Sequence, residues 1–209
     1  MEINYFGRSC FKIISKNLSI LMDPFDPQKI GLKMPKVETD VLLVSHSHHD
    51  HSYTGNIKGE YLLFDSPGEY EVKGINIDGI LSYHDESKGS ERGTNTIFII
   101  EIEDMKLCHL GDLGTDLDSA QLEKIDGVDI LFIPIGGNYT IDSKTAVKII
   151  SDVGPRIVIP MHYATEKETD LAGLDKFLIE VGEEAEVLDK LKVTKKDLEE
   201  GLKVVVLKS

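Results

Sequence analysis

The chain has 209 residues, of which 41% are hydrophobic and 29% are charged, as in a soluble globular protein. This length allows one domain with a sizeable core, and no feature requires a second, so we expect a single domain over residues 1–209. A net charge of −14 without a basic patch disfavours nucleic acid as a partner and favours a small-molecule substrate.

Two further absences bound the class of protein. No apolar run approaches the roughly 20 residues that span a bilayer, and the first residues do not resemble a secretory signal, so we expect a cytoplasmic protein without a membrane partner. Cys10 and Cys108 are too few for a disulfide framework, and both lie in apolar, strand-like runs. They are therefore predicted to be buried structural thiols and not catalytic residues.

The beginning of the chain predicts a β-meander. Three short strands separated by turn-like pairs are expected at residues 3–6, 10–14 and 18–22. The segment Asp23-Pro24-Phe25-Asp26-Pro27 ends the meander, because proline restricts its own backbone and that of the residue before it. Residues 28–38 are polar, which predicts a loop that borders the mouth of a site.

The densest group of metal-binding side chains follows residues 41–44, an apolar run that predicts a buried strand. Residues 45–51 read Ser-His-Ser-His-His-Asp-His. His46 and His48 are two residues apart, so in an extended segment their imidazoles point to the same side. Asp50 and His51 follow where a short helix over residues 52–56 is expected. Three imidazoles and a carboxylate suit zinc, manganese or iron, whereas a histidine-rich surface tract that binds metal only incidentally is the alternative.

Several later strands end in the same way. Strands are expected at residues 60–64, 68–72, 75–83, 96–101, 106–110, 128–133, 156–159 and 201–207. Helices are expected at residues 119–125, 143–150 and 171–181, with a short charged helix or turn at 195–200. His84, Asp112 and His162 each follow an apolar strand, as His46 does, which predicts that these side chains gather at one edge of packed sheets. Arg92 and Asn95 either contact a substrate anion or brace the loop after His84.

The pattern His-x-His-x-Asp-His after a buried strand resembles the signature of the metallo-β-lactamase fold superfamily of binuclear metal hydrolases. The resemblance extends in the same order to Asp23-Pro24, His84, the segment His109-Leu110-Gly111-Asp112 and the segment Pro160-Met161-His162-Tyr163. It covers the chain from about residue 3 to residue 163.

This resemblance implies a four-layer αββα sandwich and two divalent metal ions, with zinc expected and manganese or iron as alternatives. Carried over residue by residue, it assigns one ion to His46, His48 and His84, the other to Asp50, His51 and His162, and a bridging role to Asp112. Asp50 and Asp112 are the expected catalytic carboxylates. A water between the ions, deprotonated near neutral pH, would attack an ester, amide, lactone or thioester.

The resemblance leaves other roles and functions open. Asp23 either forms a turn or orients a ligating histidine, and His109 is expected to orient a ligand or to pack as a plain imidazole. His49 is expected not to be a ligand, and Tyr83, Asn138 and Tyr163 are candidates for the mouth of the site by adjacency alone. The alternative functions are a phosphodiesterase or nuclease-like hydrolase of the same superfamily, a protein that binds metal without turnover, and a di-iron oxidoreductase.

Overall fold

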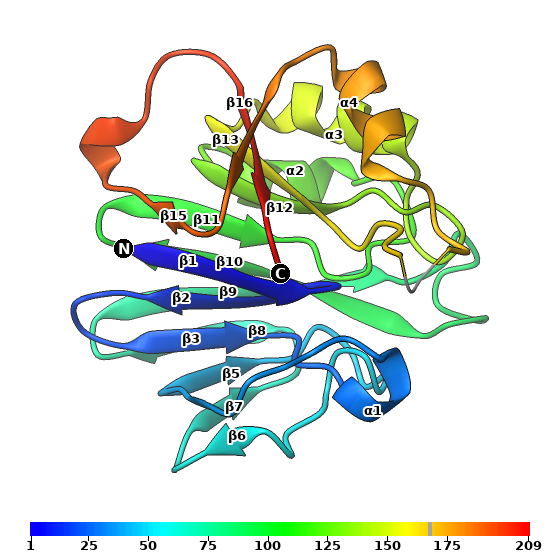
Figure 1. The fold of residues 1–209 in the computed structure, drawn as a ribbon. Helices are drawn as coiled ribbons and strands as arrows, with labels where there is room; N and C mark the ends of the chain where they lie inside the picture. Colours follow the sequence, from blue (N-terminus) through cyan, green and yellow to red (C-terminus); the bar gives the residue numbers. More distant parts are fainter. Residues whose placement is uncertain (167–168) are drawn as a thin grey trace.

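Two stacked β-sheets form the centre of the structure, a computed structural model that describes residues 1–166 and 169–209 (Figure 1). The six-stranded sheet has the order β15 (Leu191–Lys192), β1 (Glu2–Gly7), β2 (Cys10–Ile14), β3 (Ser19–Met22), β5 (Val41–Leu43), β7 (Leu62–Phe64). The eight-stranded sheet has the order β14 (Ala185–Leu188), β16 (Lys203–Leu207), β13 (Ile157–Met161), β12 (Ile130–Pro134), β11 (Met105–His109), β10 (Thr94–Ile102), β9 (Ile75–Tyr83), β8 (Gly68–Val72).

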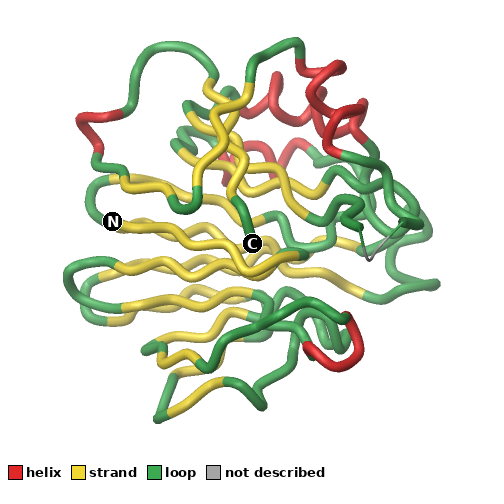
Figure 2. The backbone as a smooth tube through the Cα atoms, viewed as in Figure 1, coloured by secondary structure: helices red, strands yellow, loops and turns green. Residues whose placement is uncertain are grey.

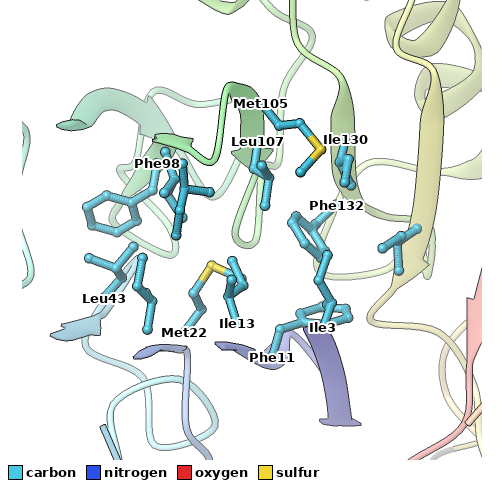
Figure 3. Packing of buried hydrophobic residues seen from close by; sticks show 14 of the residues in the cluster. Ile3, Phe11, Ile13, Met22, Leu43, Phe98, Met105, Leu107, Ile130 and Phe132 are labelled. Atoms are coloured by element: carbon cyan, nitrogen blue, oxygen red, sulfur yellow. The ribbon is translucent and has the colours of Figure 1, made fainter. Parts of the chain in front are cut away.

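Alternating side chains place the core between the two sheets. On β12, Ile130 and Phe132 enter the cluster between the sheets, whereas Leu131 and Ile133 enter the cluster beneath the helices. This follows from the two-residue period of a strand, which sends successive side chains to opposite faces. Figure 3 shows side chains of both sheets, among them Phe11 and Phe132, meeting in the space between the sheets.

The two outer layers are unequal. Helices α2 (Ser119–Ile125), α3 (Ser143–Val153) and α4 (Leu174–Val181) cover the outer face of the eight-stranded sheet, as Figure 2 shows in red. On the outer face of the six-stranded sheet, the short helix α1 (Pro27–Ile30) and nearby loops cover a smaller apolar cluster. The predicted αββα sandwich is therefore confirmed, with one helical layer reduced to a single turn.

Strand direction explains why the candidate residues share one edge. In the eight-stranded sheet β9, β11, β12 and β13 run in the same direction, because β10 is antiparallel to both β9 and β11 and the following pairs are parallel. In the other sheet β3 and β5 are parallel. Two backbone hydrogen bonds join the sheets at this edge: Thr96 donates to Ser45 over 2.8 Å, and His162 donates to Arg8 over 2.9 Å.

Several predicted elements need correction. Residues 52–56 form no helix, because the Ser52 hydroxyl donates to the His48 carbonyl oxygen over 2.8 Å and the Tyr53 amide donates to the Pro24 carbonyl oxygen, so these groups hold a turn instead. Within the predicted loop 28–38, the structure has part of α1 and β4 (Val37–Glu38), which pairs with β6 (Ile57–Lys58). Strands β14 and β15 were not predicted, and the start of α4 was predicted at Leu171, three residues before Leu174.

The remaining elements agree with expectation within a few residues, including the segment 195–200, where a 3-10 helix (Lys195–Asp197) forms. Cys10 and Cys108 are both buried as predicted, and burial raises the pKa of each thiol. None of the helices in the described ranges has the length and apolar character that a membrane crossing requires.

The inter-sheet core should dominate stability. Ile130 is 0% exposed and Ile179, on α4, is 80% exposed, so the same truncation can be compared in both places. Ile130→Ala should lower the free energy of unfolding by about 2–5 kcal/mol, because it removes buried methyl groups and leaves a cavity. Ile179→Ala should change it by about 0.5 kcal/mol or less. Urea unfolding followed by circular dichroism measures both, and equal losses would contradict this assignment of the core.

Candidate metal centre

Seven predicted residues meet at the shared edge of the sheets. The loop after β5 provides His46, His48, Asp50 and His51, while His84, Asp112 and His162 follow β9, β11 and β13. Six of the seven are buried, and His48 is exposed. They form two groups, and within each group the candidate ligand atoms all lie within 4.8 Å of one another. The first group is His46, His48 and His84, and the second is Asp50, His51, Asp112 and His162.

The first group consists of imidazoles alone. Nε2 of His46 lies 3.0 Å from Nδ1 of His48, and the rings of His46 and His84 are 4.7 Å apart between centroids. Burial, together with the nearby His51, lowers the pKa of His46 to about 3, and burial also lowers the pKa of His84. Both rings are therefore neutral near pH 7 and keep a lone pair for a metal ion.

Asp112 connects the two groups through a single oxygen. Its Oδ2 lies 3.4 Å from Nε2 of His84 in the first group, and 3.2 Å from Nε2 of both His51 and His162 in the second. Its Oδ1 accepts a hydrogen bond from the Ser9 hydroxyl over 3.3 Å. Burial alone would raise the pKa of Asp112, but the charges of His162 and His51 lower it well below its ordinary value.

His51 shows whether these residues fit a metal ion. It is 0% exposed, and neither of its ring nitrogens makes a hydrogen bond within the described part of the chain, although Nε2 is 3.2 Å from Asp112 Oδ2. Burial lowers its pKa, but the charges of Asp112 and Asp23 outweigh burial and raise it. These carboxylates attract a cation to the position of the ring. A proton can be shared between only two atoms, whereas a metal ion accepts lone pairs from several ligand atoms at once. The nitrogens and carboxylate oxygens that converge here therefore fit a metal ion.

Behind His51 lies a layer of supporting contacts built around Asp23. The Asp23 carboxylate accepts hydrogen bonds from the Ser45 amide over 2.7 Å, the Ser45 hydroxyl over 2.8 Å and His109 Nε2 over 2.9 Å, and its Oδ2 is 3.1 Å from His51 Nδ1. His109 packs edge-on against Phe11 and Phe132 and belongs to neither ligand group. Of the two readings of Asp23, this geometry favours the one in which it orients a histidine.

Three residues at the site have strained backbones. Asp23 has a φ of 44°, His162 a φ of 51° and Arg8, which contacts His162, a φ of 55°, all in the left-handed region that side chains disfavour. At His162 the carbonyl oxygen packs against Gly136, where a Cβ atom would collide with it. Strain of this kind is of the order of 1–3 kcal/mol per residue and concentrates at functional sites.

Arg8 belongs to the site, although the sequence pattern around it predicts only a turn. Its Nη2 lies 2.9 Å from Asp50 Oδ2, and its Nη1 lies 3.2 Å from His162 Nε2. Its carbonyl oxygen accepts the His162 amide over 2.9 Å. No local pattern identifies such a residue, because its partners lie far away in the sequence.

The cleft in front of the two groups has a volume of about 680 Å³. Residues from several loops line it: Arg8, Lys29, Ile30, His48, His49, Asp50, His84, Arg92, Asp112, Tyr139, His162, Thr169 and Asp170. His49 thus faces the cleft but belongs to neither ligand group. Tyr83, Asn138 and Tyr163 are not among the lining residues, and Tyr163 packs against the apolar cluster beneath the helices.

The structure gives different roles to Arg92 and Asn95, for which the sequence left two roles open. Asn95 is buried, donates to the Ser82 hydroxyl over 2.7 Å and to the Leu110 carbonyl over 2.9 Å, and accepts the Asp112 amide over 3.0 Å. It therefore braces the turn that carries Asp112. Arg92 instead lines the cleft, with its guanidinium over the Tyr139 ring at 4.6 Å from the centroid.

Comparison with known proteins gives consistent results. Residues 2–162 match the family model described as a beta-lactamase superfamily domain. A UPF0173 metal-dependent hydrolase from Thermococcus onnurineus is 30% identical, covering 90% of this chain and 95% of that protein. Another from Carboxydothermus hydrogenoformans is 31% identical over 79% of this chain and 85% of its own length. A crystal structure from Thermotoga maritima, described as a Zn-dependent hydrolase of the metallo-beta-lactamase superfamily, has a TM-score of 0.83 at 35% identity and covers 99% of both chains.

The turn at Gly111 should be essential for placing Asp112. Gly111 has a φ of +58°, and a Cβ there would collide with Asn95 Oδ1 and lie 2.6 Å from Ser45 Cβ. Gly154 has a similar φ of +62°, and a Cβ there would have no atom of the described residues within 4 Å beyond its chain neighbours, so it serves as a matched control. Both alanine variants should lose about 1–2 kcal/mol through the left-handed backbone. Gly111→Ala should lose about 1–3 kcal/mol more through overpacking.

Urea unfolding of the two alanine variants measures this difference. Zinc titration should in addition show weaker binding only in Gly111→Ala, because only this substitution displaces the Asp112 turn. Equal unfolding losses with unchanged zinc affinity would contradict the role given to this turn.

Proposed function

The chain belongs to the beta-lactamase superfamily and is a metal-dependent hydrolase of the UPF0173 group, and on that premise we propose that it cleaves small ester, lactone, thioester or amide substrates with two divalent metal ions. The observation that carries the binuclear proposal is the contact of one oxygen, Asp112 Oδ2, with nitrogens of both ligand groups. A single carboxylate oxygen with neighbours in both groups is suited to bridge two ions.

The donor set supports zinc, with manganese or iron as alternatives. Imidazole nitrogens and carboxylate oxygens are the ligands, and no thiol lies in either group. His46, His48 and His84 would hold one ion, and Asp50, His51 and His162 the other, with Asp112 shared. When bound, the ions would lower the pKa of a water toward neutrality and polarise the scissile carbonyl.

The chain's own residues orient and balance these ligands. The Ser45 hydroxyl lies 3.0 Å from His46 Nδ1, and Asp23 Oδ2 lies 3.1 Å from His51 Nδ1. In both rings these contacts leave Nε2 directed at the ligand group. Asp50 and Asp112 line the cleft, where they act as the catalytic carboxylates of the proposal. Burial opposes ionisation of Asp50, but His51 and Arg8 lower its pKa well below the ordinary value, so the carboxylate stays charged.

Two properties support a small substrate. The cleft of about 680 Å³ has the size of a small-molecule site. The net charge of −14 repels phosphate chains, which would need a basic surface to bind at physiological salt. A carbonyl substrate of limited size meets both conditions.

Metal analysis tests the ligand assignment. Protein reconstituted with zinc should bind close to two ions per chain, and His84→Ala should lose one of them, because His84 belongs to the first group. His109→Ala should weaken binding only mildly, since His109 contacts Asp23 and neither group. His49→Ala is the matched control, in the same loop but outside both groups, and should bind as the wild type does. Full zinc content in His84→Ala, or reduced content in His49→Ala, would contradict the assignment.

Hydrolysis assays test the reaction class. A panel of aryl esters, lactones, thioesters and phosphodiesters, assayed with zinc and with manganese, should show turnover of carbonyl substrates. Asp112→Ala should lose most of this activity, at least about a hundredfold, because the shared carboxylate would touch both ions. Ile179→Ala, an exposed substitution outside the lining of the cleft, should retain it. Turnover of phosphodiesters alone would assign the chain to the nuclease-like reaction, and metal binding without any turnover would indicate a binding protein.

A further inference from the structure

The loop that carries Arg92 is held in place by a buried carboxylate. Asp85 follows His84 directly and is buried. It accepts the backbone amides of Gly89 over 2.9 Å, Glu91 over 3.1 Å and Arg92 over 2.8 Å. Three converging amides fix the loop's conformation, because moving the loop would leave a buried carboxylate unpaired. The backbone of Arg92 is therefore set relative to His84, a candidate ligand.

The side chain of Arg92 is positioned by a second loop. Its guanidinium lies over the Tyr139 ring at 4.6 Å, and the Tyr139 hydroxyl donates to Asp170 over 2.9 Å. This cation–π contact does not need the guanidinium N–H groups as hydrogen-bond donors to a carboxylate or phosphate. Within the described ranges no carboxylate pairs with this guanidinium, so the edge that recognises carboxylate or phosphate has no partner there.

The charges along the cleft point to the same kind of ligand. Arg8, Lys29 and Arg92 line it, in a chain whose net charge is −14. Three carboxylates also line it: Asp50 pairs with Arg8, Asp170 accepts the Tyr139 hydroxyl, and Asp112 contacts the imidazoles of both groups, so all three are engaged. Lys29, on α1, has no ion pair in the part of the chain that the structure describes. Two cations without carboxylate partners thus face the cleft from separate segments.

We propose that Arg92, supported by Lys29, forms a subsite for an anionic group of the substrate, a carboxylate or a phosphate. The proposal rests on the proposed function and narrows it, because the substrate then carries both a hydrolysable carbonyl bond and a remote negative charge. Arg92 is the specificity-determining residue, and Tyr139 and Asp85 position it. A substrate without the charge enters the same cleft but lacks the contact with the guanidinium.

Ligand binding tests the subsite without requiring turnover. The zinc-loaded full chain is titrated calorimetrically with butyrate, which has one carboxylate. It is also titrated with succinate, glutarate and adipate, which have two carboxylates separated by increasing lengths of chain. The tightest dicarboxylate should bind at least about tenfold more strongly than butyrate, because a charge-assisted contact to arginine is added. A further titration with 3-phosphonopropionate shows whether the subsite prefers a phosphonate, which resembles a phosphate, to a carboxylate.

Three variants locate the effect. Arg92→Gln should remove the preference for dicarboxylates over butyrate, and Arg92→Lys should keep part of the preference because it keeps the charge without the planar edge. Arg156→Gln is the matched control, since Arg156 is exposed and does not line the cleft. Circular dichroism and zinc content confirm that each variant is folded and loaded.

The outcomes separate this proposal from the proposed function. Equal binding of dicarboxylates and butyrate by the wild type, or a preference that survives Arg92→Gln, overturns the subsite, whatever the hydrolysis assays give. Absence of turnover together with an Arg92-dependent preference supports the subsite and contradicts the proposed reaction. Where esters are cleaved, an anionic ester such as mono(4-nitrophenyl) glutarate should show a KM that rises at least about tenfold in Arg92→Gln, with kcat nearly unchanged.

Discussion

The contact of Asp112 Oδ2 with three imidazoles is the constraint on which the rest of the site depends. His51 lies in the loop after β5 of the six-stranded sheet, whereas His84 and His162 directly follow β9 and β13 of the eight-stranded sheet. Their Nε2 atoms meet one oxygen at 3.2–3.4 Å. A buried carboxylate is unfavourable unless it is compensated, so the convergence of these nitrogens stabilises the charge and fixes the edge where the sheets meet. Asn95, Ser9 and the Gly111 turn serve this one placement.

The two ligand groups are electrostatically unequal because of Arg8. The first group has only imidazoles of its own, whereas the second has Asp50 beside the permanent charge of Arg8. A neutral imidazole has one lone pair, so His162 Nε2 could not accept from Arg8 and hold an ion at the same time. An ion held by the second group would therefore displace the contact between Arg8 and His162. The pair between Arg8 and Asp50 can persist, because a carboxylate has several acceptor positions.

The sequence predicted which candidate ligand residues come together better than it predicted the residues that support them, and the reason is distance along the chain. His46, His48, Asp50 and His51 lie in one loop, and each remaining ligand follows an apolar strand, so strand ends and direction suffice to collect them. Arg8 contacts His162, 154 residues later, and Asp23 contacts His109, 86 residues later. Such pairs follow from the stacking of the sheets, which no local pattern describes. The helix expected over residues 52–56 was wrong because side-chain hydrogen bonds of Ser52 compete with a helical turn.

In this fold the candidate ligands follow the strands, whereas the residues proposed to recognise the substrate lie in loops. The ligand-bearing positions follow strands whose hydrogen bonds and inter-sheet core hold them rigidly, and strain at Asp23 and His162 persists because that surrounding structure over-determines it. Arg92, Tyr139 and Asp170 instead come from three separate loops, whose side chains contact one another in front of the same groups. Substitutions in these loops can change which group of a substrate is recognised without moving Asp112. The substrate is therefore determined by contacts that the fold itself leaves unspecified.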